Sequence, residues 1–494
     1  MSKRANIEEE LQSLLGEAVS ASPLERELYA HDLAAVPSFL SKALINATPD
    51  IVAKPRSTED VSALLKYTSD HRVPVTPRAA GSTAFHNTVP TKGGILLDLN
   101  ALRGIVEVDA ERQTVTVLPA TRWKELDDEL RYGWGLAVKT YPTSAPSGTV
   151  GGWFNMGGLG VGGLKYGPLR DLVPKYVVVL PGGDVRTATG ESDPSVAWFA
   201  GAEGTLGVIT SLELSVRRTP EAASNHLMAF EDATSLQQAA LALAGSTPRP
   251  YHLHVADDAY VRMTRVAGFA SPVPDGLCSL LVRYEGNAVE VEAGAHSASA
   301  IARKHGGLEL SQETAEEVWD HRFSEVRLKR AGPSLLGVEL LLPLAKLRDF
   351  IADAHRIGKE HGVYIFTYGT IVSEAYAQPN AFFPTDERQR LPHLLALSIT
   401  KKLHDIVRRL GGRPYSIGLW NTPYIGHTYS DKDLKDLRRR KQLLDPSNVM
   451  NPGKLYVPPV PLAPPFFGVA MDILAKFRKI ESNTYLRYPL REGA

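Results

Sequence analysis

The sequence predicts an α+β chain of two or three domains, and three observations support this fold class. The chain has 494 residues, which is too long for one compact core. From Ile51 to Ala53 it reads as a strand, Ser57 to Asp60 caps a helix, and a second strand follows at Val73 to Thr76. In the middle of the chain, expected helices alternate with expected strands: 235–243, 289–305 and 344–361 against 277–284, 337–342 and 363–368. Such alternation packs helices on one face of an antiparallel sheet.

Composition limits the classes of partner. Lysine plus arginine and aspartate plus glutamate both number 55, so no basic surplus favours nucleic acid. Cys278 is the single cysteine, which excludes an internal disulfide and an iron–sulfur cluster held by the chain's own thiolates. The segment from Met1 to Gly16 reads as a charged amphipathic helix without the apolar core of a signal peptide. With no apolar window of roughly eighteen residues, we expect a cytoplasmic protein without a transmembrane segment.

A glycine-rich stretch from Ser147 to Gly167 is the most unusual part of the sequence. Nine of its twenty-one residues are glycine, too many for a helix or strand interior, where each costs roughly 0.5–1 kcal/mol against alanine. Glycines let peptide N–H groups approach an anion, so we expect this stretch to line a phosphate or cofactor site. A flexible linker is the alternative, but linkers are polar and this stretch carries Trp153, Phe154 and Leu164.

Two further turns are rich in small residues. Pro77 to Ala84 follows a strand and offers successive N–H groups, two hydroxyls and the cation of Arg78, which suits a pyrophosphate. A plain tight turn remains the alternative for this segment. A second such turn lies between Trp198 and Thr210 and leads into a strand expected over Val208 to Val216.

The resemblance to a known family rests on these motifs. Arg78 to Thr83 resembles the first phosphate loop of the FAD-binding oxidoreductases of the vanillyl-alcohol oxidase and p-cresol methylhydroxylase superfamily. Thr149-Val150-Gly151-Gly152, followed by Lys165-Tyr166-Gly167, is similar to its second signature, and Glu203 to Ile209 is similar to its third. Leu444 to Lys454 resembles the C-terminal signature of the branch that contains glycolate oxidase and D-lactate dehydrogenase flavoprotein subunits. All four motifs stand in the family's order.

The resemblance implies an FAD-binding domain made from both ends of the chain, with an α+β cap domain inserted between them. The implied division is 1–219 for the first part of the FAD domain, 220–412 for the cap and 413–456 for the return to the FAD domain. Residues 457–494 then form a proline-tethered amphipathic tail, with an expected helix from Phe466 to Ile480. This tail packs on its own domain, on a partner, or on an anionic membrane surface.

The resemblance also implies which residues bind FAD. They are the residues of the three loops, the turn before the second loop and the C-terminal signature: Arg78, Ala79, Ala80, Gly81, Ser82, Thr83, Pro142, Ser144, Gly148, Thr149, Val150, Gly151, Gly152, Glu203, Gly204, Gly207, Val208, Ile209, Asn451 and Lys454. Some relatives attach the flavin covalently through a histidine four residues after the arginine of the first loop, where this chain has Ser82. We therefore expect non-covalent FAD and interpret His86 as a surface or loop histidine.

Two histidine-bearing stretches of the hydroxyacid branch are absent. After Gly411-Gly412 the chain reads Arg413-Pro414-Tyr415-Ser416, and around Gly369 it reads Phe366-Thr367-Tyr368-Gly369-Thr370. The imidazole and carboxylate ligands that a divalent metal needs are missing at these positions. We therefore expect no metal site, and chelators should leave activity unchanged.

Four residues are the candidates for catalysis. Arg322 matches a Trp-x-x-Arg pattern of the family's cap, whose arginine faces the substrate carboxylate, although a solvated arginine on a helix is an equal alternative. Tyr368, Tyr415 and His427 are candidate proton acceptors, each with a packing role as the alternative. His427 is favoured because an imidazole titrates near neutral pH.

The sequence thus predicts a dehydrogenase with non-covalent FAD that oxidises a hydroxyl-bearing carbon, of a small 2-hydroxy acid such as D-lactate or glycolate. The alternative is a flavin-bearing electron-transfer subunit without activity of its own on hydroxy acids. Because the chain has no cluster, the electrons must pass to an external acceptor, such as an iron–sulfur protein or a quinone. Peripheral contact with the inner face of a membrane through the C-terminal tail is a further expectation.

Overall fold

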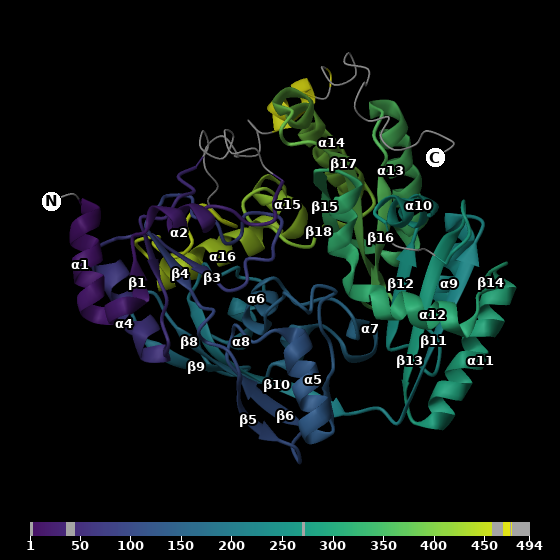
Figure 1. Ribbon diagram of the computed structural model, residues 1–494, viewed down its shortest axis with the longest axis horizontal. Helices are drawn as coiled ribbons and strands as arrows, with labels where there is room; N and C mark the ends of the chain where they lie inside the picture. The colour runs from purple at the N-terminus through teal and green to yellow at the C-terminus, as the bar shows by residue number, and fades with distance from the viewer. Residues whose placement is uncertain (1–2, 36–44, 269–271, 457–467, 475, 477–494) are drawn as a thin grey trace. The chain divides into compact units, whose positions relative to one another are not determined.

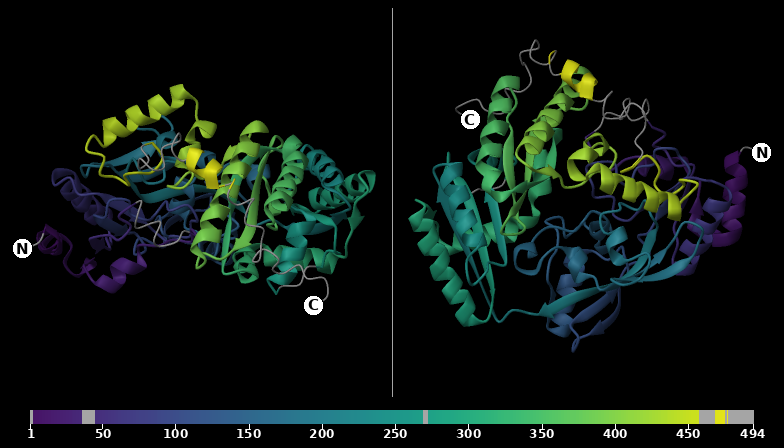
Figure 2. Two further views of the ribbon diagram at one scale, coloured as in Figure 1. Left: turned by 90° about the horizontal axis from the view of Figure 1, so that it is seen from above. Right: turned by 180° about the vertical axis from the view of Figure 1, so that it is seen from behind.

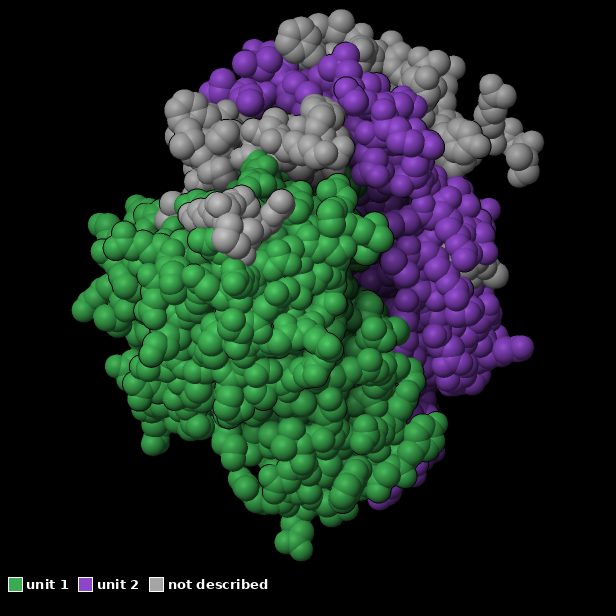
Figure 3. Space-filling view, turned by 60° about the vertical axis from the view of Figure 1, so that its left-hand side comes forward, with its two compact units in different colours: residues 1–158, 169–219, 416–466 green, residues 159–168, 220–415, 467–494 purple. Residues whose placement is uncertain are grey.

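The structure is a computed structural model that describes residues 3–35, 45–268, 272–456, 468–474 and 476. The chain forms two compact units. Unit 1 contains residues 1–158, 169–219 and 416–466, and unit 2 contains residues 159–168, 220–415 and 467–494. Figure 3 colours unit 1 green and unit 2 purple. The chain therefore leaves unit 1 after residue 219 and returns to it at residue 416.

Unit 1 begins with a four-stranded sheet in the order β1-β2-β4-β3 (Figure 1). Its strands are β1 (Val19–Ser20), β2 (Ile51–Ala53), β4 (Ile95–Asp98) and β3 (Val75–Arg78), and β4 pairs in parallel with β2 and β3. Helix α4 (Thr58–Asp70) starts at Ser57, whose side chain accepts the Asp60 N–H at 3.1 Å, as the sequence predicts. Val61, Leu64 and Leu65 of α4 pack into the core with this sheet and with α1 (Lys3–Leu15).

A second sheet of unit 1 is antiparallel. Strands follow the order β5-β6-β10-β8-β9, and β7 pairs with the far end of β10. The bounds are β5 (Ile105–Asp109), β6 (Thr114–Val117), β7 (Leu136–Val138), β8 (Lys175–Val179), β9 (Val185–Thr189) and β10 (Val208–Arg218). Helices α5 (Trp123–Trp134) and α8 (Val196–Phe199) accompany it. The alternation of apolar and polar residues over 105–118 predicts a hairpin, and β5 and β6 form it.

The glycine-rich stretch contains two short helices, so the expectation that it excludes helix was wrong. They are α6 (Val150–Asn155) and α7 (Gly163–Tyr166). Packing explains α6, because a Cβ on Gly151 would lie 2.6 Å from the Pro119 Cβ. Tertiary contact at this close approach outweighs the low helix propensity of glycine.

Unit 2 is built on an eight-stranded sheet in the order β14-β11-β13-β12-β16-β17-β15-β18, whose pairs are all antiparallel (Figures 1 and 2). The bounds are β11 (Ala222–Phe230), β12 (His252–Ala256), β13 (Cys278–Gly286), β14 (Leu308–Glu309), β15 (Ser334–Pro343), β16 (Phe366–Ile371), β17 (Tyr376–Thr385) and β18 (Arg413–Pro414). The middle of the chain is therefore an α+β domain, as its helix and strand alternation predicts.

Helices lie on both faces of this sheet. The three expected helices, α9 (Ala233–Ala244), α11 (Ala288–Lys304) and α13 (Leu347–His361), share a core with Leu253, Val255 and Leu280. Helix α10 (Asp258–Val266) packs Met263 against Phe366 and Tyr368. In a strand successive side chains alternate in direction, so Phe366 and Tyr368 belong to the opposite face. The expectation of helices on one face alone was wrong, because α10, which was not predicted, packs on the second face. Helices α12 (Gln312–Asp320) and α14 (Arg390–Arg409) complete the larger elements of unit 2.

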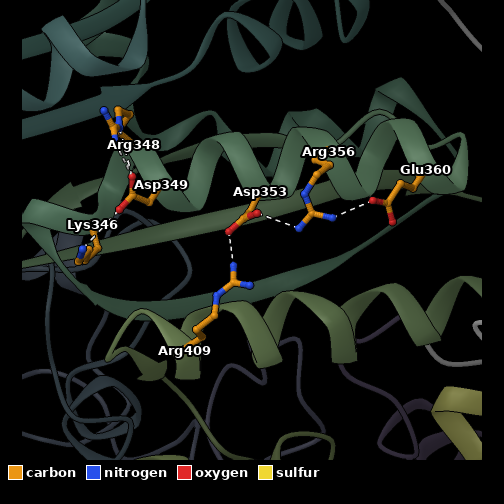
Figure 4. A network of polar contacts seen from close by, with 7 residues as sticks. All are labelled: Lys346, Arg348, Asp349, Asp353, Arg356, Glu360 and Arg409. Carbon is orange, nitrogen blue, oxygen red and sulfur yellow. Dashed lines mark hydrogen bonds and ion pairs between the residues drawn. The ribbon is translucent and has the colours of Figure 1, made fainter.

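A chain of ion pairs follows the outer surface of α13 (Figure 4). Arg356 bridges Asp353 at 2.8 Å and Glu360 at 2.7 Å, and Arg409 of α14 also contacts Asp353. Exposed pairs of this kind each contribute roughly 0–1 kcal/mol. This face of α13 is therefore a solvated surface.

The C-terminal part of unit 1 returns to the first sheet. After α15 (Ile425–Thr428) and α16 (Asp431–Leu444), the Val75 N–H of β3 donates to the Val449 carbonyl at 2.8 Å. The Asn451 N–H donates to the Val75 carbonyl at 2.7 Å. These bonds fix the Leu444 to Lys454 motif beside the strand that carries the first loop.

The expected tail helix from Phe466 to Ile480 is described in part, at residues 468–474 and 476. Within it, residues 468–474 are helical, Val469 and Ile473 are exposed, and Asp472 forms an ion pair with Lys401 of α14 at 3.0 Å. In the part of the chain that is described, no helix is both long and apolar enough to cross a membrane.

Candidate functional site: a cofactor cradle in unit 1

The first loop, Arg78 to Thr83, leaves the end of β3 with its backbone N–H groups open. Among the described residues, no acceptor is found for the N–H groups of residues 79–83, and these residues are half-buried. Gly81 has φ of 64°, and a Cβ there would lie 2.5 Å from the Arg78 guanidinium. Consecutive unpaired N–H groups around a left-handed residue form a concavity suited to an anion.

Arg78 holds the neighbouring segment beside this loop. Its guanidinium donates to the His31 carbonyl at 2.6 Å and lies 5.3 Å from the centre of the Tyr29 ring. Burial lowers the pKa of Arg78 from its usual value, which the negative charge of Asp32 partly opposes. The arginine thus supplies positive charge to a partly dry site.

The second loop is a compact turn that leads into α6. Within the turn, the Ala145 N–H donates to the Pro142 carbonyl at 3.0 Å, and the Gly148 N–H donates to the Ser144 carbonyl at 2.6 Å. The first N–H groups of α6 are already paired: Val150 donates to Thr121 at 2.9 Å and Gly151 to Pro119 at 2.8 Å. Thr149 precedes the helix in extended conformation, and a Cβ on Gly152 would lie 2.7 Å from its hydroxyl.

The third loop places Glu203 at the centre of unit 1. Its carboxylate accepts the Ile417 N–H at 3.0 Å, the Gly418 N–H at 2.7 Å and the Asn87 amide at 2.7 Å. Burial raises the pKa of Glu203 to about 7, although these hydrogen bonds oppose the rise. Glu203 of the third loop therefore connects Asn87, which follows the first loop, to residues 417 and 418.

The glycines of the third loop allow close packing. Gly204 has φ of 70°, and a Cβ there would lie 2.6 Å from the Pro77 ring. A Cβ on Gly207 would lie 2.7 Å from the Val179 carbonyl of β8. Val208 and Ile209 then open β10 as buried residues.

Asn451 and Lys454 bring the C-terminal motif into the same cluster. The Asn451 amide donates to the Asn87 carbonyl at 3.1 Å and to the Glu203 carbonyl at 2.8 Å. The Lys454 ammonium is buried, donates to the Val89 carbonyl at 2.6 Å, and has a pKa lowered to about 7 by burial. The Oδ1 atom of Asn451 is a buried acceptor for which no donor is found among the described residues. A buried unpaired acceptor is costly unless a ligand or water satisfies it.

Lys441 of α16, which was not predicted as a site residue, links the third loop to the C-terminal motif. Its buried ammonium donates to the Thr205 carbonyl at 2.8 Å, the Met450 carbonyl at 2.7 Å and the Asp445 carboxylate at 2.5 Å. Asp445 in turn accepts the Val449 N–H at 3.0 Å. The spacing of lysine and aspartate at i and i+4 on a helix was the available signal.

His86 lies in a loop, as one half of its interpretation has it, but it is buried and not at the surface. Only 3% of its side chain is exposed, and Nδ1 lies 2.7 Å from the Asp32 carboxylate, which is itself fully buried. Its ring also lies 5.5 Å from the Trp420 ring. The loop after residue 83 folds inward here because the histidine finds a charged partner.

The catalytic candidates fall in both units. Arg322 of unit 2 stacks on Trp319 at 4.1 Å and on Phe323 at 4.2 Å, and it donates to the Trp319 carbonyl at 2.8 Å. Tyr368 is buried on β16, and Tyr415 follows β18, where its hydroxyl accepts the Leu159 N–H at 3.1 Å. His427 belongs to α15 of unit 1, 5.6 Å from the Tyr424 ring. Catalytic roles for these residues stay predictions.

The described residues contain no group of three histidine, cysteine, aspartate or glutamate side chains that could hold a metal ion. The cradle of unit 1 fits a different ligand. Open N–H groups at residues 79–83, the nearby guanidinium of Arg78 and the orphan acceptor of Asn451 suit a phosphorylated cofactor that also carries hydrogen-bond donors.

A pH titration tests the electrostatics of this cradle. Because folding raises the pKa of Glu203 from about 4.3 to about 7, the folded protein binds this proton more tightly than the unfolded chain. The contribution of Glu203 to the free energy of unfolding should therefore fall by roughly 3 kcal/mol as the pH rises through this window. In urea titrations, Glu203→Gln should make the slope of stability against pH in this window less steep than in wild type. Parallel curves for the two proteins would show that Glu203 ionises normally.

Comparison with known proteins identifies the cofactor. Residues 49–189 match the family described as FAD binding domain, and residues 219–455 match the family described as FAD linked oxidases, C-terminal domain. The chain is 26% identical over 471 residues to the glycolate oxidase subunit GlcD of Bacillus subtilis, covering 91% of this chain and 97% of that protein. It is 25% identical over 430 residues to the mitochondrial D-lactate dehydrogenase [cytochrome] of Arabidopsis thaliana, covering 83% of this chain and 74% of that protein.

Solved structures agree on the fold. The chain superposes on p-cresol methylhydroxylase with a TM-score of 0.78 at 16% identity, covering 93% of this chain and 98% of that chain. It superposes on alkyldihydroxyacetonephosphate synthase with a TM-score of 0.74 at 19% identity, covering 90% of this chain and 84% of that chain. The predicted α+β fold, an FAD-binding part with an inserted cap, is confirmed. The chain belongs to the FAD-linked oxidases and is an FAD-dependent oxidoreductase of the kind that acts on CH–OH groups.

Proposed function

We propose that the protein is a dehydrogenase that oxidises the hydroxyl-bearing carbon of a small 2-hydroxy acid and passes the electrons to an external acceptor. The observation that carries this proposal is the similarity to a glycolate oxidase subunit and a D-lactate dehydrogenase over most of the chain. Bound FAD would supply the hydride acceptor, and the protein would supply binding and orientation. A flavin-bearing electron-transfer subunit is the second candidate, favoured by the absence of a metal-ligand group among the described residues.

The residues of unit 1 divide the work of holding FAD. The N–H groups of residues 79–83 would hold the pyrophosphate, and Arg78 would add positive charge beside it. Asn451 offers its orphan Oδ1 to a donor of the cofactor, while Glu203, Lys454 and the second loop hold the walls in place. In unit 2, Arg322 is the proposed partner of the substrate carboxylate, with Tyr368 and Tyr415, and His427 of unit 1, as candidate proton acceptors.

The cysteine content implies that the electron acceptor is a separate molecule. Cys278 is buried in the core of unit 2, and burial raises the pKa of its thiol to about 12. It is therefore a packing residue that binds no cluster. An iron–sulfur protein or a quinone is the proposed acceptor.

Attachment of the flavin can be tested directly. Because Ser82 stands where some relatives have a histidine, and His86 is buried against Asp32, the FAD should be non-covalent. Purified protein should be yellow and should release all its FAD into the supernatant when denatured by acid or heat. Flavin that stays with the precipitated chain, and migrates with it on a denaturing gel, would contradict this prediction.

Anaerobic flavin reduction tests the proposed activity. The holoprotein is mixed with glycolate, D-lactate, L-lactate and 2-hydroxybutyrate, and bleaching of the flavin absorbance is followed. Bleaching by at least one acid without a partner protein supports the dehydrogenase. Bleaching by dithionite alone would leave the electron-transfer subunit as the better assignment.

A further inference from the structure

A short segment of unit 1 runs along the first loop. Residues 29–33, which we call the strap, follow α2 (Pro23–Leu28) and lie outside both matched family regions, 49–189 and 219–455. At the end of the strap, the Leu33 N–H donates to the Thr83 carbonyl at 2.9 Å. One residue earlier, the Asp32 carboxylate lies 2.7 Å from Nδ1 of His86. The strap is therefore fixed to the last residue of the first loop and to the segment that follows it.

The start of the strap holds one edge of the Arg78 guanidinium. Nη1 of Arg78 donates to the His31 carbonyl at 2.6 Å and to the Tyr29 carbonyl at 3.4 Å. The other edge, Nε and Nη2, lies beside Gly81, where a Cβ would come within 2.5 Å of both atoms. Among the residues that the structure describes, no acceptor is found for these two nitrogens. The strap thus leaves a pair of N–H donors on the side of the guanidinium that faces the first loop.

The side chain of Tyr29 lies against this guanidinium. The centre of its ring is 5.3 Å from Cζ of Arg78, a distance at which an aromatic face attracts a cation. The Tyr29 hydroxyl donates to the carboxylate of Asp98, which ends β4. Burial and the charge of Asp98 raise the pKa of this hydroxyl well above its usual value, so it remains a donor. Tyr29 is therefore held at both its backbone and its hydroxyl while its ring contacts Arg78.

Asp98 also holds the start of the first loop. The carboxylate is buried, and its Oδ1 accepts the Asn100 N–H at 2.9 Å and the Asn100 amide at 2.6 Å. That amide donates in turn to the Ala79 carbonyl at 3.1 Å. The ring beside Arg78 and the backbone of the first loop are therefore tied to the same carboxylate. Because Asp98 lies at the end of a strand, this anchor is part of the sheet.

We propose that Tyr29 is a positioning residue for FAD, which holds the Arg78 guanidinium with its Nε and Nη2 edge toward the pyrophosphate. This proposal goes beyond activity on hydroxy acids and rests only on the placement of the pyrophosphate at the first loop. A guanidinium binds phosphate most strongly through two parallel N–H bonds, which require a fixed plane. An arginine without the strap would lose rotamer freedom when FAD binds. The strap orders Arg78 beforehand and so strengthens binding of FAD.

The test measures the Kd for FAD by diluting the holoprotein and following the fluorescence of released FAD. Tyr29→Leu removes both the ring and the hydroxyl and should raise the Kd by roughly 10–30-fold, as expected when a contact to a charged group is lost. Tyr29→Phe keeps the ring and should raise the Kd by a smaller factor. Tyr132→Leu is the matched control, because Tyr132 is a tyrosine of unit 1 that is 91% exposed, and it should leave the Kd unchanged.

A double-mutant cycle separates positioning of Arg78 from a general loss of stability. In protein that already carries Arg78→Met, Tyr29→Leu should change the Kd by less than about twofold, because its effect passes through the guanidinium. ADP, which carries the pyrophosphate without the flavin, should lose affinity by the same factor as FAD when it is measured as a competitor.

The outcomes distinguish the role of Tyr29 from the placement of the pyrophosphate. A wild-type Kd in Tyr29→Leu, equal effects of Tyr29→Leu with and without Arg78→Met, or an unchanged affinity for ADP would overturn the role of Tyr29 alone. If Arg78→Met itself leaves the Kd at the wild-type value, the pyrophosphate does not lie at the first loop, and both proposals fail.

Discussion

Replacing Glu203 with alanine should lower the free energy of unfolding by 3 kcal/mol or more and should leave the purified protein largely without FAD. The buried N–H groups of Ile417 and Gly418 would lose their acceptor, and the Asn87 amide would be left with its 3.3 Å contacts to the Ser416 hydroxyl and the Met156 sulfur. Each unsatisfied buried donor costs roughly 1–3 kcal/mol. Urea unfolding gives the free energy, and the ratio of flavin to protein absorbance gives the FAD content.

FAD should be lost because Glu203 holds separate segments of the cradle together. Its backbone carbonyl accepts the Asn451 amide, which also binds the Asn87 carbonyl. Without the carboxylate, the segment at 417–418 is released from the third loop, and the orphan acceptor of Asn451 loses its fixed position. Asp184→Ala is the matched control, because Asp184 is a carboxylate of unit 1 that is 69% exposed and pairs only at the surface with Arg186. A full complement of FAD in Glu203→Ala would show that the cradle does not depend on this carboxylate.

Local sequence patterns predicted much of unit 1. Ser57 caps α4 as its spacing with Asp60 indicates, and the alternation over residues 105–118 is a hairpin. These features depend on hydrogen bonds within a few residues, which a sequence displays directly. The family motifs led to FAD because loops that approach a cofactor need small residues at fixed positions.

The features that local sequence patterns did not predict depend on contacts between distant segments. The helix α6 forms in a glycine-rich stretch because Gly151 packs on Pro119, which periodicity does not report. His86 is buried because Asp32, far away in the sequence, supplies its partner.

Replacing Lys441 with methionine should destabilise unit 1 by roughly 3–5 kcal/mol, the usual cost when one partner of a buried ion pair is removed. Methionine fills similar space but donates no hydrogen bond, so Asp445 would keep a buried charge without its ammonium. The carbonyls of Thr205 and Met450 would also lose their donor. Since each kcal/mol shifts Tm by roughly 2–4 °C in a domain of this size, Tm should fall by about 6–20 °C.

Lys441 also sets the distance between the third loop and the C-terminal motif, so its loss should weaken FAD binding as well as stability. Lys435→Met is the matched control, because Lys435 is an exposed lysine of the same helix. Thermal unfolding followed by flavin fluorescence reports release of FAD and loss of structure in one scan. Lys441→Met together with Asp445→Asn should recover part of the stability, because asparagine removes the unpaired buried charge and keeps an acceptor for the Val449 N–H. If Lys441→Met alone unfolds at the wild-type temperature, the link between Thr205 and Met450 does not stabilise the fold.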